Sequence, residues 1–171
     1  MTTTRKTVLS LALTLTALLA LTITASAASY WDGISGAELP NATNTEGRFV
    51  GTAWGNLPGG WYIDVKHDAL PGNSTSVFIN GGSFKLDTVM GWRPVTVFGY
   101  FPWHGGTVTQ TDGFSGCGNQ HFSVSGRIAG VQGGSGYGYF NAKLTHYRHW
   151  VWWLGCVIYS ASVSGSVSLT F

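Results

Sequence analysis

The sequence predicts an all-β protein, a single antiparallel barrel of about eight strands that follows an N-terminal signal peptide. Three observations lead to this prediction. After the leader, apolar and polar residues alternate with the period of two that is typical of half-buried strands. Glycine is abundant, at 25 of 171 residues, and interrupts several of these runs, as the bends of a closing sheet require. No later segment combines apolar residues at helical spacing with capping residues.

The first 27 residues have the three parts of a signal peptide. Arg5 and Lys6 form a basic start, residues 8–23 are an apolar stretch, and residues 25–27 read Ala-Ser-Ala, which suits cleavage. A leader of this kind directs the chain out of the cytoplasm, so we expect a secreted, extracellular protein.

After the signal peptide at 1–27, we expect residues 28–46 to be a flexible lead-in, with room for a short strand near Tyr30-Trp31, and residues 47–171 to form the barrel domain. Asn80-Gly81-Gly82 is typical of a hairpin or a bulged turn between two short strands. Period-two alternation predicts strands at 48–54, 60–67, 76–79, 83–88, 95–101, 106–111, 120–128, 136–146 and 161–171.

The charge content excludes some classes of partner. Loss of Arg5 and Lys6 with the leader leaves seven basic residues, which equals the seven acidic ones. A chain near zero net charge lacks the basic face that nucleic acid binding needs. No later apolar stretch approaches the roughly 18 residues of a membrane span, so we expect no transmembrane segment in the mature protein.

Cys117 and Cys156 are the two cysteines of the chain and lie 39 positions apart. In an exported protein they predict one disulfide, because oxidising compartments favour that pairing. Two buried free thiols are the alternative. Two cysteines alone are a poor metal site, and we expect no metal and no cofactor.

Three segments resemble a known family. Residues 81–86 read GGSFKL, residues 122–128 lead into the glycine-rich stretch GGSGYGYF at 133–140, and residues 163–169 read VSGSVSL. Together they are similar to the dirigent and allene-oxide-cyclase-like β-barrels in a small secreted bacterial form. The resemblance covers roughly residues 47–171 and implies an eight-stranded barrel. The disulfide and the tryptophan-rich segment near Trp150 depart from the family pattern, and no catalytic residue of the family can be placed here.

The residues that could carry chemistry form no catalytic pattern. Asp64 and Asp68 share one face of a strand, but four residues of strand span roughly 13 Å, too far for a glycosidase pair. His146 and His149 would point to opposite faces of a strand and so would not chelate a metal together. Whether the protein is an enzyme stays open.

Two groups of residues are candidates for ligand binding. The inward faces of the predicted strands would place apolar side chains around a cavity, and His67 would end one of these apolar faces. A second group lies in the aromatic segment 146–153, where the rings either cap a barrel end or form an exposed platform. The candidates are Trp61, His67, Phe84, Phe122, Phe140, Trp150 and Trp152.

Three functions remain open at this point. The first is binding of a small apolar or aromatic molecule in the barrel or at its mouth. The second is binding of a glycan or cell surface through exposed tryptophans. The third is a structural, envelope-associated role without a ligand.

Overall fold

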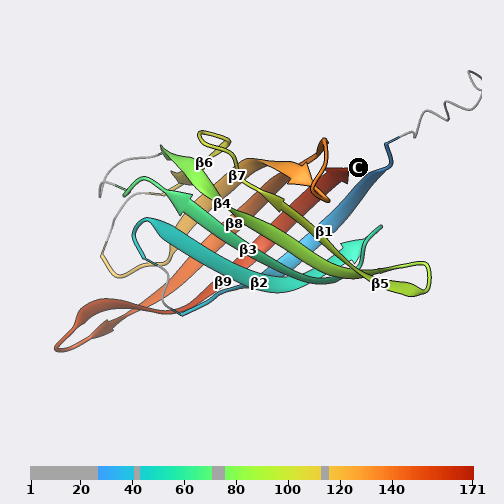
Figure 1. Ribbon diagram of the computed structural model, residues 1–171. Coiled ribbons are helices and arrows are strands. Elements are labelled where there is room, and N and C mark those ends of the chain that lie inside the picture. The colour runs from blue at the N-terminus through green and yellow to red at the C-terminus, as the bar shows by residue number, and fades with distance from the viewer. Residues whose placement is uncertain (1–26, 41–42, 71–75, 113–115) are drawn as a thin grey trace, which may run out of the picture.

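The computed structural model of the protein describes residues 27–40, 43–70, 76–112 and 116–171. Within those ranges the chain contains strands and turns but no helix, and the strands form one antiparallel sheet that closes in a ring (Figure 1). The predicted fold class, an antiparallel barrel-like protein, is therefore confirmed. The proposed signal peptide lies almost wholly outside the described residues.

Nine strands make up the sheet. They are β1 (Ser29–Glu38), β2 (Glu46–Gly55), β3 (Gly59–His67), β4 (Ser76–Met90), β5 (Arg93–Tyr100), β6 (Gly106–Gln110), β7 (Gln120–Val131), β8 (Gly136–Val151) and β9 (Gly155–Thr170).

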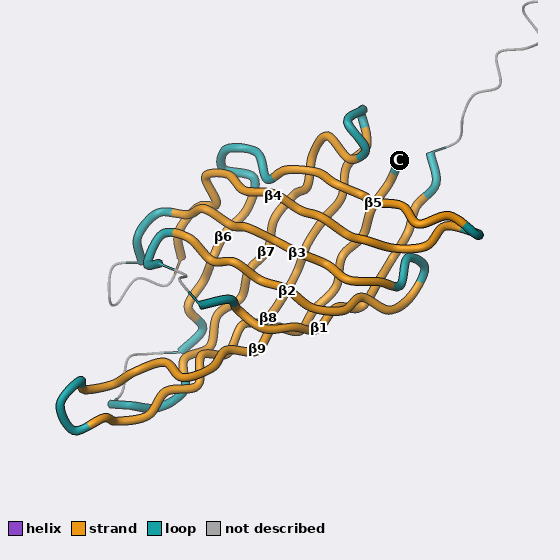
Figure 2. The backbone as a smooth tube through the Cα atoms, turned by 60° about the horizontal axis from the view of Figure 1, so that its bottom comes forward, coloured by secondary structure: helices purple, strands orange, loops and turns teal. Residues whose placement is uncertain are grey.

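The strands occupy eight positions around the ring, because β5 and β6 share one of them. β4 pairs with β5 along residues 83–90 and with β6 along residues 76–78. Both short strands also pair with β7, so the segment from Phe101 to Gly105 is a kink in what is otherwise a single strand position. The ring closes where β1 pairs with β9 over residues 29–37 (Figure 2). The expected number of about eight strands agrees with this arrangement.

The prediction of a flexible lead-in at residues 28–46 is wrong for its first part. Residues 29–38 form β1, which pairs with β2 on one side and with β9 on the other. Asp32, Gly33 and Ile34 are buried in succession. This strand therefore lacks the period-two pattern, and backbone pairing on both edges holds it in place.

The hairpin predicted at Asn80-Gly81-Gly82 is also wrong, whereas the alternative of a bulge agrees with the shift of register opposite these residues. These residues lie inside β4, which runs unbroken from Ser76 to Met90. Gly82 has a φ of 138°, and a Cβ there would lie only 2.0 Å from the carbonyl oxygen of Asp64 on the neighbouring strand. The glycines allow the long strand to bend against β3, where the register shifts between Lys66 and His67.

The inner face of the ring is filled by apolar side chains at alternate positions. On β8 the buried series is Gly138, Phe140, Ala142 and Leu144. The Phe140 ring lies 6.4 Å from the Trp61 ring and 6.3 Å from the Phe101 ring, measured between centroids. This cluster forms the centre of the core and blocks the middle of the ring.

The buried carboxylate of Asp32 joins β1 to the β2–β3 turn. Its Oδ1 atom accepts a hydrogen bond from the backbone N–H of Leu57 at 2.7 Å, and Asp32 is fully buried. Burial raises the pKa of this carboxyl above its usual value, while the backbone donors of Leu57 and Asn56 act in the opposite direction.

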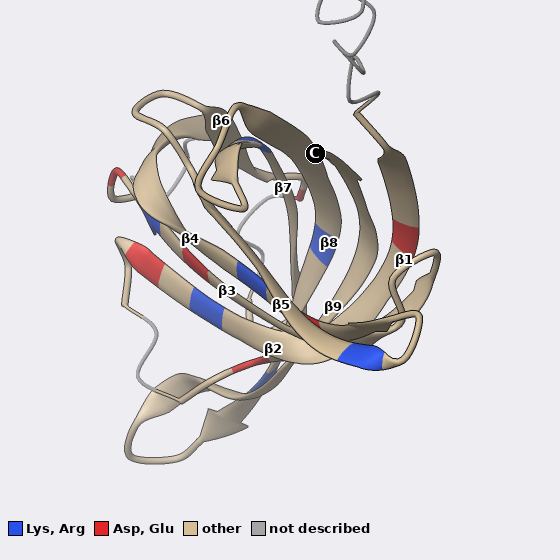
Figure 3. Cartoon of the chain, turned by 45° about the vertical axis from the view of Figure 1, so that its right-hand side comes forward, with Lys and Arg blue, Asp and Glu red and all other residues tan. Residues whose placement is uncertain are grey.

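Charged residues are few and lie scattered along the strands (Figure 3). In the view of Figure 3, basic and acidic positions are interspersed along the strands. The arrangement agrees with the small charge imbalance of the sequence, which has nine Lys and Arg and seven Asp and Glu.

Candidate functional site

One end of the ring opens into a cavity of about 340 Å³. It lies where β1, β3 and β6 end and β2 and β7 begin, so its walls come from strands that are far apart in the sequence. The volume is near the lower end of the range for small-molecule pockets, roughly 300–1,000 Å³. The cavity is thus large enough for one small ligand.

The deeper wall of this cavity is apolar because the inward series of several strands continues into it. On β7 and β8 the facing pairs are Phe122 with Leu144 and, one step deeper, Val124 with Ala142. The apolar side chains of the lining are Phe49, Val65, Leu70, Val108, Phe122, Val124, Leu144 and Ile158.

The mouth of the cavity is polar. The inward series of β7 and β8 ends in Gln120 and His146, which face each other directly across the two strands. Side chains opposite each other on one face of an antiparallel pair have Cβ atoms roughly 5 Å apart. The polar side chains of the lining are Glu38, Thr43, Asn44, His67, Gln110, Gln120 and His146.

A buried ion pair or hydrogen bond joins His146 to Glu38 at this mouth. The two atoms, His146 Nε2 and Glu38 Oε2, lie 2.7 Å apart, and their side chains are only 14% and 12% exposed. A carboxylate oxygen only accepts, so Nε2 carries the hydrogen. The ring of Phe122 packs against the imidazole at a tilt of 55°, with the two centroids 5.0 Å apart. His146 is therefore fixed in orientation.

The two glutamines of the lining differ in their hydrogen bonding. Gln110 donates through Nε2 to the carbonyl oxygen of Asp112 at 2.8 Å. Gln120 is 6% exposed, and its Nε2 atom has no hydrogen-bond partner among the described residues. A buried amide donor without a hydrogen bond lowers the stability of the folded protein. Gln120 is therefore the group of this lining that a ligand could satisfy.

Two of the predicted ligand-binding residues line the cavity. Phe122 contributes to its apolar wall and His67 to its mouth. The Nδ1 atom of His67 lies 2.8 Å from the carbonyl oxygen of Asp68, so this histidine is anchored to the backbone. Trp61, Phe84 and Phe140 point into the ring but are packed in its filled core, away from the cavity lining.

The other two predicted residues, Trp150 and Trp152, lie on a hairpin that extends beyond the ring. β8 and β9 continue as a two-stranded ribbon after the register shift at Tyr147, and the ribbon projects from the lower left of the body in Figure 1. Trp152 is 86% exposed at its tip, beside the exposed Trp153. The interpretation of these tryptophans as a cap of the barrel end does not fit that exposure.

Two other exposed tryptophans, Trp92 and Trp103, do not join this tip. Trp92 lies in the β4–β5 turn, at the opposite end of the ring, since Thr88 pairs with Gly59 at the start of β3. Trp103 lies in the β5–β6 connection, where its ring stacks on His104 with centroids 4.8 Å apart.

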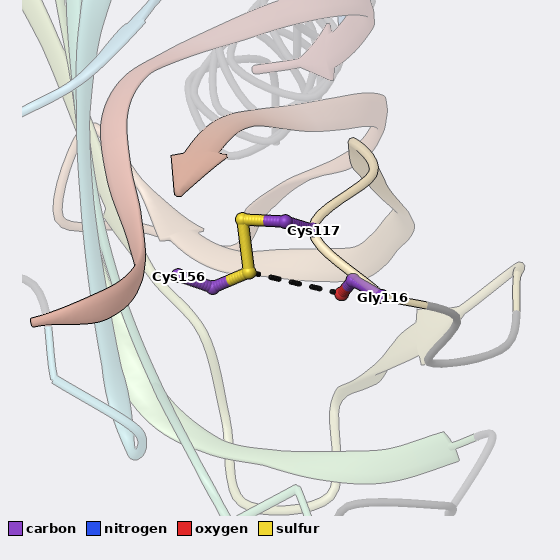
Figure 4. Close-up of a disulfide and its surroundings, with 3 residues drawn as sticks. All are labelled: Gly116, Cys117 and Cys156. Atoms are coloured by element: carbon purple, nitrogen blue, oxygen red, sulfur yellow. Dashed lines mark hydrogen bonds between the residues drawn. A yellow bond between two sulfur atoms is a disulfide. The ribbon is translucent and has the colours of Figure 1, made fainter. Parts of the chain in front are cut away.

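The predicted disulfide between Cys117 and Cys156 is confirmed (Figure 4). It ties the loop before β7 to the projecting hairpin near its tip, where Cys156 pairs with Trp150, and the two Cα atoms lie 5.5 Å apart. The Sγ atom of Cys156 also lies 3.8 Å from the carbonyl oxygen of Gly116. A disulfide is consistent with an extracellular location.

Sequence reasoning missed the central polar group of this cavity. Glu38 fell in the expected lead-in, and its partner His146 is 108 positions away along the chain. The sequence did contain a signal for His146 and Gln120. Each lies two positions from the end of an apolar series, on the same inward face of its strand. The same pattern identified His67 at the end of Trp61, Ile63 and Val65.

Comparison with protein-family models finds no match for this chain, and comparisons with curated proteins and with solved structures find none either. Within the described residues there is also no helix with the length and hydropathy that crossing a bilayer requires.

Proposed function

We propose that this protein is a secreted, small-molecule-binding β-barrel that holds one apolar or aromatic ligand at the mouth of the ring. We also propose that the chain belongs to the family that its sequence resembles, the dirigent and allene-oxide-cyclase-like barrels. The observation that carries it is the cavity of about 340 Å³, with an apolar inner wall and a small polar mouth. This combination is typical of small-molecule sites, where apolar surface gives affinity and a few polar groups fix orientation.

The filled centre of the ring limits where such a ligand can bind. The Phe140, Trp61 and Phe101 cluster blocks passage through the middle, so the ligand enters and leaves by the same mouth. A compact ligand of one or two rings suits this depth better than a long chain that would pass through the barrel.

Leu144→Trp is expected to lower the affinity for an uncharged aromatic probe by about tenfold or more. Leu144 is nearly fully buried in the cavity wall, and an indole at this position occupies the volume that a ligand would use. The measurement is a fluorescence titration with prodan, a neutral two-ring naphthalene dye that brightens in apolar surroundings.

Lys143→Trp is the matched control, because Lys143 is the neighbouring residue and is exposed on the outer face of β8. It should leave dye affinity unchanged. Native mass spectrometry of the purified wild type should in addition reveal a bound apolar species. If wild type and both variants fail to bind the dye and the purified protein carries no ligand, the proposal is wrong.

The exposed hairpin tip favours a second candidate function, the binding of a glycan or cell surface. Trp150, Trp152 and Trp153 are all largely exposed on a ribbon held away from the body (Figure 2). Isolated exposed rings of this size are costly to leave in water, and such patches usually mark interaction surfaces.

Trp152→Ala is expected to reduce retention on insoluble polysaccharide by about fivefold or more, because truncation of a central aromatic anchor removes most of its contact area. Trp92→Ala, at an equally exposed tryptophan on the other end of the ring, should bind as the wild type does. The assay is a pull-down with depletion measured in the supernatant. Equal retention of both variants and wild type would exclude the tip as the binding surface.

A further inference from the structure

We infer that the ligand of the barrel mouth is an uncharged molecule that carries an oxygen, a carbonyl or a hydroxyl, beside its apolar body. This inference rests on the proposed function and specifies the chemistry of the same cavity. It follows from three features of the mouth: the unsatisfied Gln120 amide, the His146–Glu38 pair, and the absence of Lys and Arg from the described lining.

The first feature is the missing partner of Gln120. Its Nε2 donor is shielded from water and makes no hydrogen bond within the described chain, whereas the amide of Gln110 in the same lining is satisfied. The terminal torsion of a glutamine is broad, so a small rotation turns the amide toward the cavity. A ligand oxygen at this point would supply the missing acceptor, and its binding would remove the cost of the unpaired donor.

The second feature places this oxygen next to His146. Gln120 and His146 face each other on the inner side of β7 and β8, and the step below them is the apolar pair of Phe122 and Leu144. A ligand with its rings against Phe122 therefore places its polar end between the glutamine and the imidazole. The cavity therefore suits an amphipathic ligand whose single polar end lies at the mouth.

The third feature concerns charge. Glu38 already occupies His146 at 2.7 Å, and the described lining contains no lysine or arginine that would balance a second carboxylate. His67, the remaining titratable group of the lining, is bonded to a backbone carbonyl. A ligand anion would lose its hydration and meet the Glu38 carboxylate without a free cation. A neutral oxygen avoids both costs.

The test compares four naphthalene derivatives substituted at the same ring position: naphthol, acetylnaphthalene, methylnaphthalene and naphthoate. Titration calorimetry with wild type should show naphthol and acetylnaphthalene binding about 2- to 12-fold tighter than methylnaphthalene, the value of one hydrogen bond. Naphthoate should bind more weakly than either of them.

Gln120→Leu is expected to remove the preference for the oxygen-bearing compounds while methylnaphthalene binds as well as before or better. Ser123→Leu, on the exposed outer face of the same strand, should keep the wild-type preference. Circular dichroism and thermal melting confirm that each variant is folded.

The possible results distinguish a failure of this inference from a failure of the proposed small-molecule-binding function. Equal binding of all four compounds, or tightest binding of naphthoate, would overturn the inference and leave the small-molecule function intact. A preference that survives in Gln120→Leu would also overturn it. If no compound binds to wild type, both the inference and the proposed function fail.

Discussion

Phe140→Ala is expected to lower the free energy of unfolding by about 3–5 kcal/mol, the range for truncating a buried phenylalanine. Phe140 is 1% exposed and packs against Trp61 and Phe101, the two rings that close the middle of the barrel. Its facing residue on β7 is Gly126, where a Cβ would lie 3.0 Å from the Phe101 ring. Neither Gly126 nor the aromatic pair can fill the space that the lost ring leaves.

The measurement is urea denaturation followed by circular dichroism. Tyr139→Ala is the matched control, because Tyr139 is adjacent in sequence, half exposed, and on the outer face of the same strand. It should cost less than about 1 kcal/mol. Similar losses for the two variants would contradict the assignment of Phe140 to a tightly packed centre. The total stability of a domain is about 5–15 kcal/mol, so the larger loss leaves little margin.

Replacing both Cys117 and Cys156 by serine is expected to lower the free energy of unfolding by up to about 4 kcal/mol. The disulfide closes a loop of 39 residues, and the chain-entropy model gives this value for a loop of that length. It also joins the loop before β7 to the hairpin that projects from the ring, close to the turn of that hairpin. The measurement is the unfolding midpoint in guanidinium chloride.

Reduced wild type is the control for this variant, since dithiothreitol removes the same bond without a change of side chain. It should unfold at the same denaturant concentration as the double serine variant, below oxidised wild type. An unchanged midpoint on reduction would show that the bond does not constrain the unfolded chain.

The strand pattern was predictable wherever one face of a strand is buried and the other exposed. β7 and β8 alternate over most of their length, and their predicted starts at residues 120 and 136 match the structure. Only a short strand near Tyr30-Trp31 was anticipated where β1 runs, because three consecutive residues from Asp32 to Ile34 are buried and hide the period-two pattern. Backbone pairing with β2 and β9 forms this strand instead. Pairing with strands that are distant in the sequence cannot be predicted from the pattern of residues within one strand.

The candidate site was predictable only in part for a related reason. Phe122 and His67 were identified because each belongs to an inward series within its own strand. Trp61, Phe84 and Phe140 share that property, but whether inward rings line a cavity or fill it depends on the side chains that meet them from the other strands. Glu38 and His146 meet only after the ring has closed.

The pairing of the first and last strands has a consequence for how the protein acquires its shape. Ala28 and Phe171 exchange two backbone hydrogen bonds, of 3.0 and 3.1 Å, and the hydroxyls of Ser29 and Thr170 meet across 141 positions of sequence. The sheet keeps an open seam until its final segment arrives, and contacts of such long range slow folding.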